Sequence, residues 1–166
     1  MSEGGWAALD PGRSKCGLVR CDASRATVIA AHIEPGEACL ERLQQWKAAG
    51  LEGVVLGDGT GSGPWPNRLR QLGLAVAVVD ERGSTLAARG RYWELMPPRG
   101  LRRLLPRGLR LPPRAIDDVV AQLLLERWLG VPLGRAAELE APLLEQERRM
   151  RRSQRRAQKR ARTVKA

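Results

Sequence analysis

The chain has 166 residues, of which 43% are hydrophobic, so it can bury one ordinary core and has little material for a second. No stretch approaches the roughly 20 apolar residues that cross a bilayer, and the N-terminus lacks the apolar run of a signal peptide. The three cysteines are odd in number and lack the paired spacing of a zinc site. These features exclude a membrane-spanning protein and favour a soluble protein of the reducing cytoplasm.

The positive charge is concentrated at the C-terminal end. The formal net charge is +11, and residues 148–166 hold ten Lys or Arg and no acid, which leaves +1 for the rest. Such a block attracts polyanions through Coulomb force and counterion release, which favours nucleic acid as the partner. An anionic membrane surface and a solvated tail without function are the alternatives. We expect one domain at 1–134 and a basic helical or disordered tail at 135–166.

The first third of the chain predicts three strands and a helix. Residues 6–9 form an apolar run that ends at Asp10 in a Pro-Gly turn, which is typical of a buried strand. Two β-leaning runs, 16–21 and 26–33, flank the polar DASR and predict an antiparallel hairpin. Apolar residues at helical spacing then predict a helix within 35–50, closed by a glycine.

The middle of the chain predicts two parallel strands. The runs GVVLG at 53–57 and LAVAVVD at 74–80 are continuously apolar, as strands that are buried on both faces require. Between them, PWPNRLRQLG at 64–73 is long enough for a crossover helix.

Two further helices are separated by an arginine-rich loop. Ser84 is expected to cap a helix that ends at Leu95, and residues 97–114 hold five prolines, six arginines and no acid, which predicts a loop. A last amphipathic helix is expected from Asp117 to near Gly130. The whole order predicts an α/β protein of the RNase H-like fold, a mixed five-stranded sheet flanked by helices.

Acidic residues are expected to converge at one edge of this sheet. Functional groups of open α/β sheets collect beyond the carboxyl ends of the parallel strands, where Asp10, Asp58 and Glu81 belong. Asp117 and Asp118 open the last helix, whose first turn is expected to pack beside the first strand. Carboxylate oxygens hold hard cations, and two such cations can clamp the attacking water and the leaving oxygen of a phosphoryl displacement.

Each acid also has a structural interpretation. Asp10 can bond to amides of the turn, Asp117 can cap its helix, and Glu81 can pair with Arg82 or Arg89. The spacing alone therefore leaves both interpretations open.

Three other features of the sequence are weaker candidates for functional sites. GDGTGSG at 57–63 lacks the lysine and spacing of a phosphate-binding loop, so a flexible turn is favoured. His32 is the only histidine and lies in a predicted strand, which leaves nucleophilic Ser/His or Cys/His sites without support. Trp65 and Trp93 lie near the proposed edge or the arginine-rich loop, where stacking on a base is an alternative to packing in the core.

Arginines are the predicted nucleic-acid contacts. Those of the loop are expected to lie at the same edge as the acids, where they would hold a phosphate backbone, and those of the tail would raise affinity without reading sequence. The predicted contacts are Arg99, Arg102, Arg103, Arg107, Arg110, Arg148, Arg149, Arg151, Arg152, Arg155 and Arg156.

Four segments in this order resemble a known family. They are ALDPGRSKCGLV at 8–19, VVLGDGTGS at 54–62, VDERGSTLAAR at 79–89 and IDDVVAQLLLERWL at 116–129. Together they resemble the YqgF family of RNase H-like, Holliday junction resolvase-like proteins over residues 7–130.

The resemblance implies a bacterial cytoplasmic nuclease that depends on Mg²⁺ or Mn²⁺. Asp10, Glu81 and Asp117 would be its catalytic, metal-binding acids, with Asp58 and Asp118 as further candidate ligands. The implied activity is processing of the precursor of small-subunit ribosomal RNA or cleavage of branched DNA, and ribosomes are a candidate partner.

One departure from the family supports an alternative function. GDGTGS at 57–62 replaces the usual Gly-x-Pro turn and resembles the YqgF-type domain of the Tex transcription-accessory proteins. This implies a non-catalytic nucleic-acid-binding module associated with transcription or ribosomes. A phosphotransferase of the actin and sugar-kinase superfamily is a third class, but that superfamily needs two such domains and this chain has room for one.

Overall fold

The computed structural model describes residues 4–139. Contacts within the chain divide it into one compact unit that ends at Arg135 and a second that begins at Ala136. The tail arginines predicted to bind nucleic acid, at 148–156, lie outside the described residues. No helix in the described part is both long enough and apolar enough to cross a membrane.

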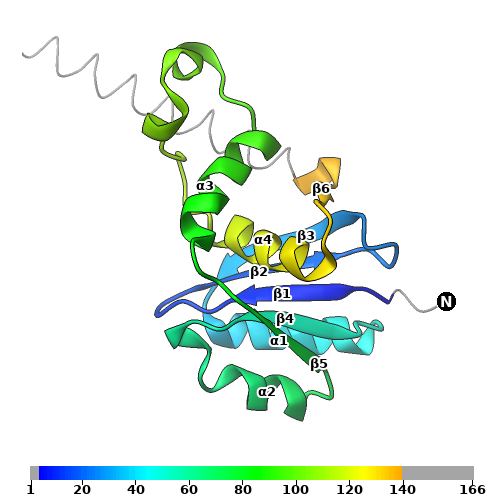
Figure 1. Cartoon of the computed structure of the whole chain (residues 1–166). Helices are drawn as coiled ribbons and strands as arrows, with labels where there is room; N and C mark the ends of the chain where they lie inside the picture. Colours follow the sequence, from blue (N-terminus) through cyan, green and yellow to red (C-terminus); the bar gives the residue numbers. More distant parts are fainter. Residues whose placement is uncertain (1–3, 140–166) are drawn as a thin grey trace, which may run out of the picture. The chain divides into compact units, whose positions relative to one another are not determined.

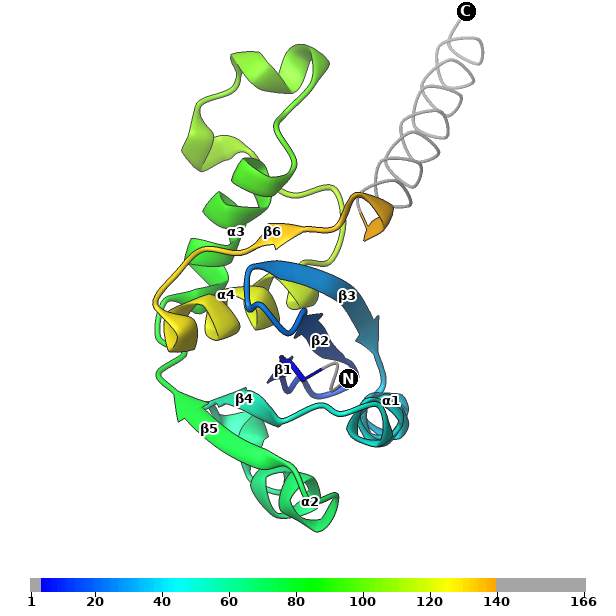
Figure 2. The same cartoon turned by 90° about the vertical axis from the view of Figure 1, so that its right-hand side faces the viewer.

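A mixed sheet forms the centre of the unit that ends at Arg135, with strand order β5-β4-β1-β2-β3-β6 (Figures 1 and 2). Its strands are β1 Trp6–Asp10, β2 Cys16–Cys21, β3 Thr27–Glu34, β4 Gly53–Gly57, β5 Ala75–Val79 and β6 Gly134–Arg135. β2 pairs antiparallel with β1 and β3, whereas β1, β4 and β5 run parallel. The carboxyl ends of β1, β4 and β5 therefore meet at one edge.

Helices cover both faces of the sheet. They are α1 Gly36–Ala48, α2 Trp65–Gln71, α3 Ser84–Leu95 and α4 Asp117–Leu129. Figure 2 shows α1 and α2 on one side of the sheet and α4 on the other. α4 packs on β1 and β2, and α3 packs on α4. Because α3 belongs to an outer layer, one of its faces is left for the loop that follows it.

The alternation of side chains along the strands builds the core. Leu9 of β1 joins a buried cluster with Leu43 of α1 and Leu69 of α2, and all three side chains are fully buried. On the other face, α4 buries Leu124 and Leu125. Burial of a leucine side chain contributes about 1.5–3 kcal/mol, so these apolar faces fix the layers.

Most predicted elements are confirmed, and so is the RNase H-like fold, through the order and directions of the strands. The sheet has six strands and not five, because the two-residue β6 pairs parallel with the start of β3. Ser84 does not cap α3: Gly83 precedes the helix with a left-handed φ of 67°, and no side chain caps its amides. The arginine-rich loop contains two short 3₁₀ helices, η2 Gly100–Leu104 and η3 Arg107–Leu109.

Candidate active site at the carboxyl edge of the sheet

Four of the predicted acids stand at the carboxyl edge of the sheet. Asp10 is the last residue of β1, Asp58 directly follows β4, and Glu81 lies two residues beyond β5. Asp117 is the first residue of α4, which packs on β1. The elements therefore gather these four residues from distant parts of the sequence.

Asp10 is the electrostatic centre of this group. Burial raises the pKa of its carboxyl most, and the negative charges of Asp117 and Glu81 raise it further, to about 6. The carboxylates of Asp117 and Glu81 thus lie close enough to Asp10 to repel its negative charge. At neutral pH Asp10 is ionised against that repulsion, which is a condition that a bound cation would relieve.

A glycine in β2 brings α4 close to Asp10. Gly17 is the sheet partner of Asp10, and a Cβ atom at Gly17 would overlap the backbone carbonyl of Asp117. Only glycine allows this approach. Nearby, Lys15 Nζ lies 4.0 Å from Asp117 Oδ2, and the two side chains are 48% and 30% exposed. Lys15 therefore offers Asp117 only a partial, solvent-screened counter-charge.

The glycine-rich turn after β4 holds a carboxylate. Cβ atoms at Gly57 or Gly59 would overlap the carboxylate oxygens of Glu81, so the turn leaves room for that side chain. Asp58 Oδ1 accepts a hydrogen bond from the Glu81 backbone N–H at 3.0 Å. The Asp58 backbone N–H donates to Val79 O at 3.0 Å. Asp58 thus positions Glu81, and the turn serves the acid cluster.

Asp118 lies apart from this group. Its side chain is buried, with Arg114 Nη1 at 2.7 Å from Oδ1 and Arg135 Nη1 at 2.8 Å from Oδ2. Burial alone would raise its pKa, but the hydrogen bonds from Arg114 and the positive charges of both arginines bring the pKa below the ordinary value. Both oxygens are occupied by arginines, so we leave Asp118 out of the candidate site.

The carboxylates at this edge have the chemistry of ligands for a divalent cation, but the distances between them are too large for a metal site. Asp10, Glu81 and Asp117 offer the oxygen donors that Mg²⁺ and Mn²⁺ prefer, and the repulsion of Asp10 by the other two favours a cation beside it. Within residues 4–139, however, no three His, Cys, Asp or Glu side chains lie close enough together to hold one metal ion. Metal binding therefore requires these carboxylates to move closer.

The arginine-rich loop does not lie directly beside the acids. Figures 1 and 2 show its first part beyond the C-terminal end of α3, at a distance from the sheet, and its second part running back along α3 to the start of α4. Arg110 braces the loop, donating to Leu105 O at 2.7 Å and to Arg103 O at 2.9 Å. Arg99, Arg103 and Arg107 are exposed.

The aromatic residues and the histidine divide between core and loop. Trp65 is only 6% exposed and belongs to the core, so it does not stack on a base. Trp93 is half-buried beside the loop, and its indole N–H donates to Arg110 O at 2.9 Å. The ring of His32 lies 6.0 Å from that of Trp46, and burial is the main cause that lowers its pKa.

Sequence reasoning missed the residues that support the acids. Gly17, Gly57 and Gly59 carry no functional group, and their importance follows only from what a Cβ atom would strike. Lys15 follows Asp10 within a short turn, and that proximity was the available signal for its pairing with Asp117.

Comparisons with known proteins give limited information. No protein-family model matches the chain, and no curated protein matches it. It is similar to the solved structure of RuvC from T. thermophilus in complex with a Holliday junction substrate, with 15% identity, 76% of this chain and 94% of that chain covered, and a TM-score of 0.48. For a structure of Thermus thermophilus RuvC, the identity is 15%, the coverage 76% and 97%, and the TM-score 0.44. The fold assignment rests on the strand order and directions described above.

Proposed function

We propose that the protein is a nuclease that hydrolyses phosphodiester bonds of structured nucleic acid with the help of Mg²⁺ or Mn²⁺. The observation that carries the proposal is the convergence of Asp10, Glu81 and Asp117 at the carboxyl edge of the sheet, where burial and the two neighbouring charges raise the pKa of Asp10. A folded protein keeps such a repulsive group at a sheet edge at a cost in stability, and perturbed carboxyls of this kind cluster at functional sites.

Asp10, Glu81 and Asp117 would hold the cations. When bound, the cations would activate water and stabilise the charge that develops on the phosphate. Asp10 has to be ionised for this, so its binding function is expected to fail below about pH 6. Asp58 orients Glu81 through its backbone N–H, and Lys15 restrains Asp117 from the solvent side. Asp58 and Lys15 are thus positioning residues.

The four motifs that resemble the YqgF family support this proposal further. They place Asp10, Glu81 and Asp117 at the positions of the presumed catalytic acids of that family. The same resemblance suggests two substrate classes, precursor ribosomal RNA and branched DNA.

The test is cleavage of labelled single-stranded RNA, duplex DNA and a four-way DNA junction, with Mg²⁺ or Mn²⁺. We expect one of these substrates to be cut, and we expect Asp10→Asn to reduce the rate by at least a hundredfold without loss of the fold. Glu41→Gln, a change of an exposed acid on α1, is the matched control and is expected to cut at the wild-type rate. Cleavage by Asp10→Asn at the wild-type rate would overturn the proposal.

A non-catalytic nucleic-acid-binding module is the second candidate. It is favoured by the spacing of the carboxylates, since no three of them in the described part of the chain are placed to hold a metal ion. This function predicts binding without cleavage by the wild type and by Asp10→Asn alike. It also predicts a steep fall of affinity with salt, because bound phosphates release counterions.

A further inference from the structure

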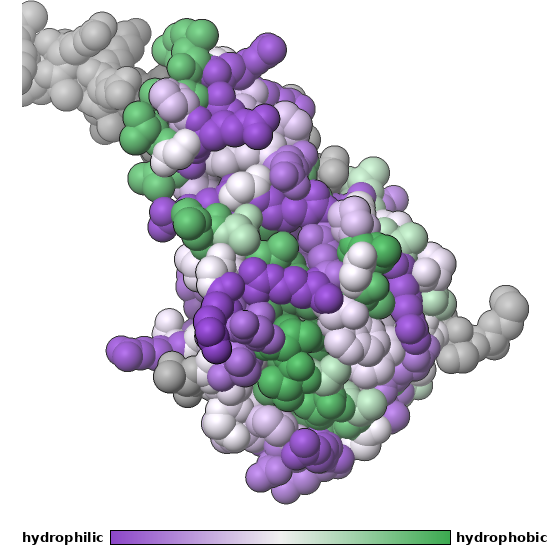
Figure 3. Space-filling model, in the orientation of Figure 1, coloured by the Kyte–Doolittle hydropathy of each residue, from purple (hydrophilic) through white to green (hydrophobic). Residues whose placement is uncertain are grey.

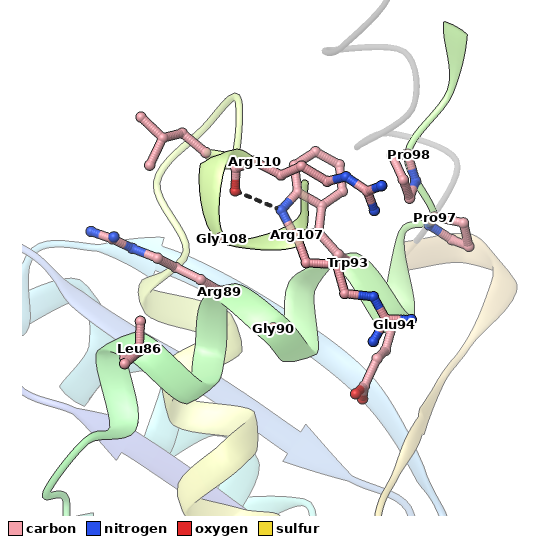
Figure 4. Close-up of a pocket in the computed structure, with 11 residues that line it drawn as sticks. Leu86, Arg89, Gly90, Trp93, Glu94, Pro97, Pro98, Arg107, Gly108 and Arg110 are labelled. Carbon is pink, nitrogen blue, oxygen red and sulfur yellow. Dashed lines mark hydrogen bonds between the residues drawn. The ribbon is translucent and has the colours of Figure 1, made fainter. Parts of the chain in front are cut away.

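A cavity of about 540 Å³ lies between α3 and the arginine-rich loop, outside the carboxylate site. One face of α3 forms one wall, and the segment around η3 forms the other (Figure 4). The apolar part of its lining comes from Leu86, Trp93, Pro97, Pro98 and Leu111. Its volume is in the range of pockets that bind small molecules, and much of its lining is apolar, as in such pockets.

Two glycines keep this cavity open. Gly90 lies in the middle of α3 and Gly108 lies in η3, and a Cβ atom at either position would meet nothing within 4 Å. Neither has a left-handed φ, so neither glycine is required by the backbone. A glycine inside a helix costs about 1 kcal/mol relative to alanine. Because Gly90 has no side chain, it leaves space in the cavity that a larger residue would occupy.

The charge around the cavity is positive and unneutralised. Arg89 and Arg107 line it, and neither forms an ion pair with a carboxylate of the described residues. Glu94, the one acid among the described residues of the lining, is paired with Arg91 at 3.1 Å. The segment 95–116 contains six arginines and no acid. Arg89 and Arg107 therefore offer an anionic ligand two guanidinium groups that no carboxylate of residues 4–139 neutralises.

Trp93 is held in place as a flat apolar wall. Its N–H already donates to Arg110 O, so the indole has no donor left for a ligand (Figure 4). Its ring packs edge-on against Tyr92, with ring centroids 4.9 Å apart. A ligand in the cavity meets a ring that can stack but cannot form a specific hydrogen bond, which is how sequence-tolerant sites contact bases.

Exposed leucines continue the apolar surface onto the loop. Leu101 and Leu104 are 83% and 81% exposed, and Leu109 is 68% exposed. Figure 3 shows hydrophobic residues in green alternating with hydrophilic ones in purple over this upper part of the molecule. Apolar groups interleaved with arginines suit a ligand that carries flat apolar rings and phosphates together.

We propose that this cavity binds one unpaired nucleotide of a nucleic-acid strand, with the base against Trp93 and the adjoining phosphates near Arg89 and Arg107. The proposal rests on the proposed function for its partner class, nucleic acid, but not on cleavage. The site distinguishes single-stranded segments, whose bases can leave the stack, from fully paired duplex.

The glycines allow the cavity to be filled without removing any contact. We would measure binding of a fluorescein-labelled single-stranded RNA oligonucleotide, and of the same sequence as a paired duplex, by anisotropy. Gly90→Phe and, from the other wall, Gly108→Phe are compared with Gly90→Ala, which leaves most of the space. Circular dichroism and thermal unfolding would verify that each variant is folded.

We expect both phenylalanine variants to bind the single strand about tenfold more weakly, a loss of about 1.4 kcal/mol, which is within what a lost base stack removes. Gly90→Ala and the binding of duplex by all variants should be unchanged. Single-strand binding that both phenylalanine variants retain would overturn the proposal. Asp10→Asn separates the two proposals, since it should abolish cleavage and leave this binding intact.

Discussion

Two groups of acids in this molecule differ in how their charge is neutralised, although adjacent residues of α4, Asp117 and Asp118, belong to different groups. At the sheet edge, Glu81 and Asp117 repel the charge of Asp10, and the one ion pair found for these three acids in the described chain joins Asp117 to Lys15 at 4.0 Å. One residue further, Asp118 is buried between two arginines. The charge of Asp10 lowers stability at neutral pH, whereas the ion pairs of Asp118 join parts of the fold, which is the difference expected between acids of the proposed site and structural acids.

The neutralised acids Asp118 and Glu126 form a polar stripe along α4 together with the amide of Gln122. Glu126 pairs with Arg91 of α3 at 2.8 Å, and Gln122 Oε1 accepts from Arg135 Nε at 2.7 Å. Gln122 Nε2 also donates to Glu126 Oε1 at 3.0 Å. Each of the three side chains is buried and hydrogen-bonded. The stripe thus joins α3 and β6 to the middle of α4.

The largest expected effect comes from breaking this stripe. Asp118→Asn removes the negative charge between Arg114 and Arg135 and leaves two poorly compensated buried cations. We expect the free energy of unfolding, measured by urea titration, to fall by about 3–5 kcal/mol. Cleavage by the protein that remains folded should persist. A fall of less than 1 kcal/mol would contradict the structural role that we assign to Asp118.

Replacing an acid at the sheet edge is expected to raise the free energy of unfolding, in contrast to Asp118→Asn. Asp10 has a folded-state pKa of about 6 against an ordinary 3.8, so the folded state holds its proton more tightly and loses stability as pH rises through this interval. Asp10→Asn removes that penalty. We expect it to raise the free energy of unfolding by roughly 2–3 kcal/mol at pH 8 and to leave it nearly unchanged at pH 3.5. Glu41→Gln should show no such dependence, and a destabilised Asp10→Asn at pH 8 would refute the comparison.

A smaller effect is expected from the cation itself. Mg²⁺ at tenfold above its dissociation constant should raise the free energy of unfolding of the wild type by about 1.4 kcal/mol, because it binds the folded state. Thermal unfolding with and without Mg²⁺ at pH 8 measures this shift. Asp10→Asn should show little of it, whereas Asp118→Asn should keep it. An equal shift in both variants would place the cation elsewhere.

The sequence predicted most elements of the fold, and the place of the main acids at one edge of the sheet, for physical reasons. Buried strands such as 53–57 and the Gly-bounded helix of α4 follow from apolar runs and turn residues, which are local signals. The convergence of Asp10, Asp58 and Glu81 on one edge follows from parallel strands alone.

Other features depend on orientation and could not be read from spacing. Asp117 and Asp118 are neighbours, but successive helical residues point about 100° apart, so only the packing of α4 shows which one lies at the edge. The arginine-rich loop was expected beside the acids because Glu81 and Asp117 flank it in sequence. Its position depends on the length and direction of α3, which carries the chain away from the sheet (Figure 1).

The small strand β6 sets a limit on how far the chain can be shortened from its C-terminal end. Leu133 O accepts hydrogen bonds from Arg91 Nη2 at 2.8 Å and from Gln122 Nε2 at 3.0 Å, and Leu133 N–H donates to Glu126 at 2.9 Å. A chain that stops after Arg135 keeps all of these bonds, whereas one that stops before Leu133 removes a hydrogen-bond partner from each of Arg91, Gln122 and Glu126. Proteolysis from the C-terminal end should accordingly stop near Leu133, whose backbone is hydrogen-bonded to Arg91 and to the polar stripe of α4.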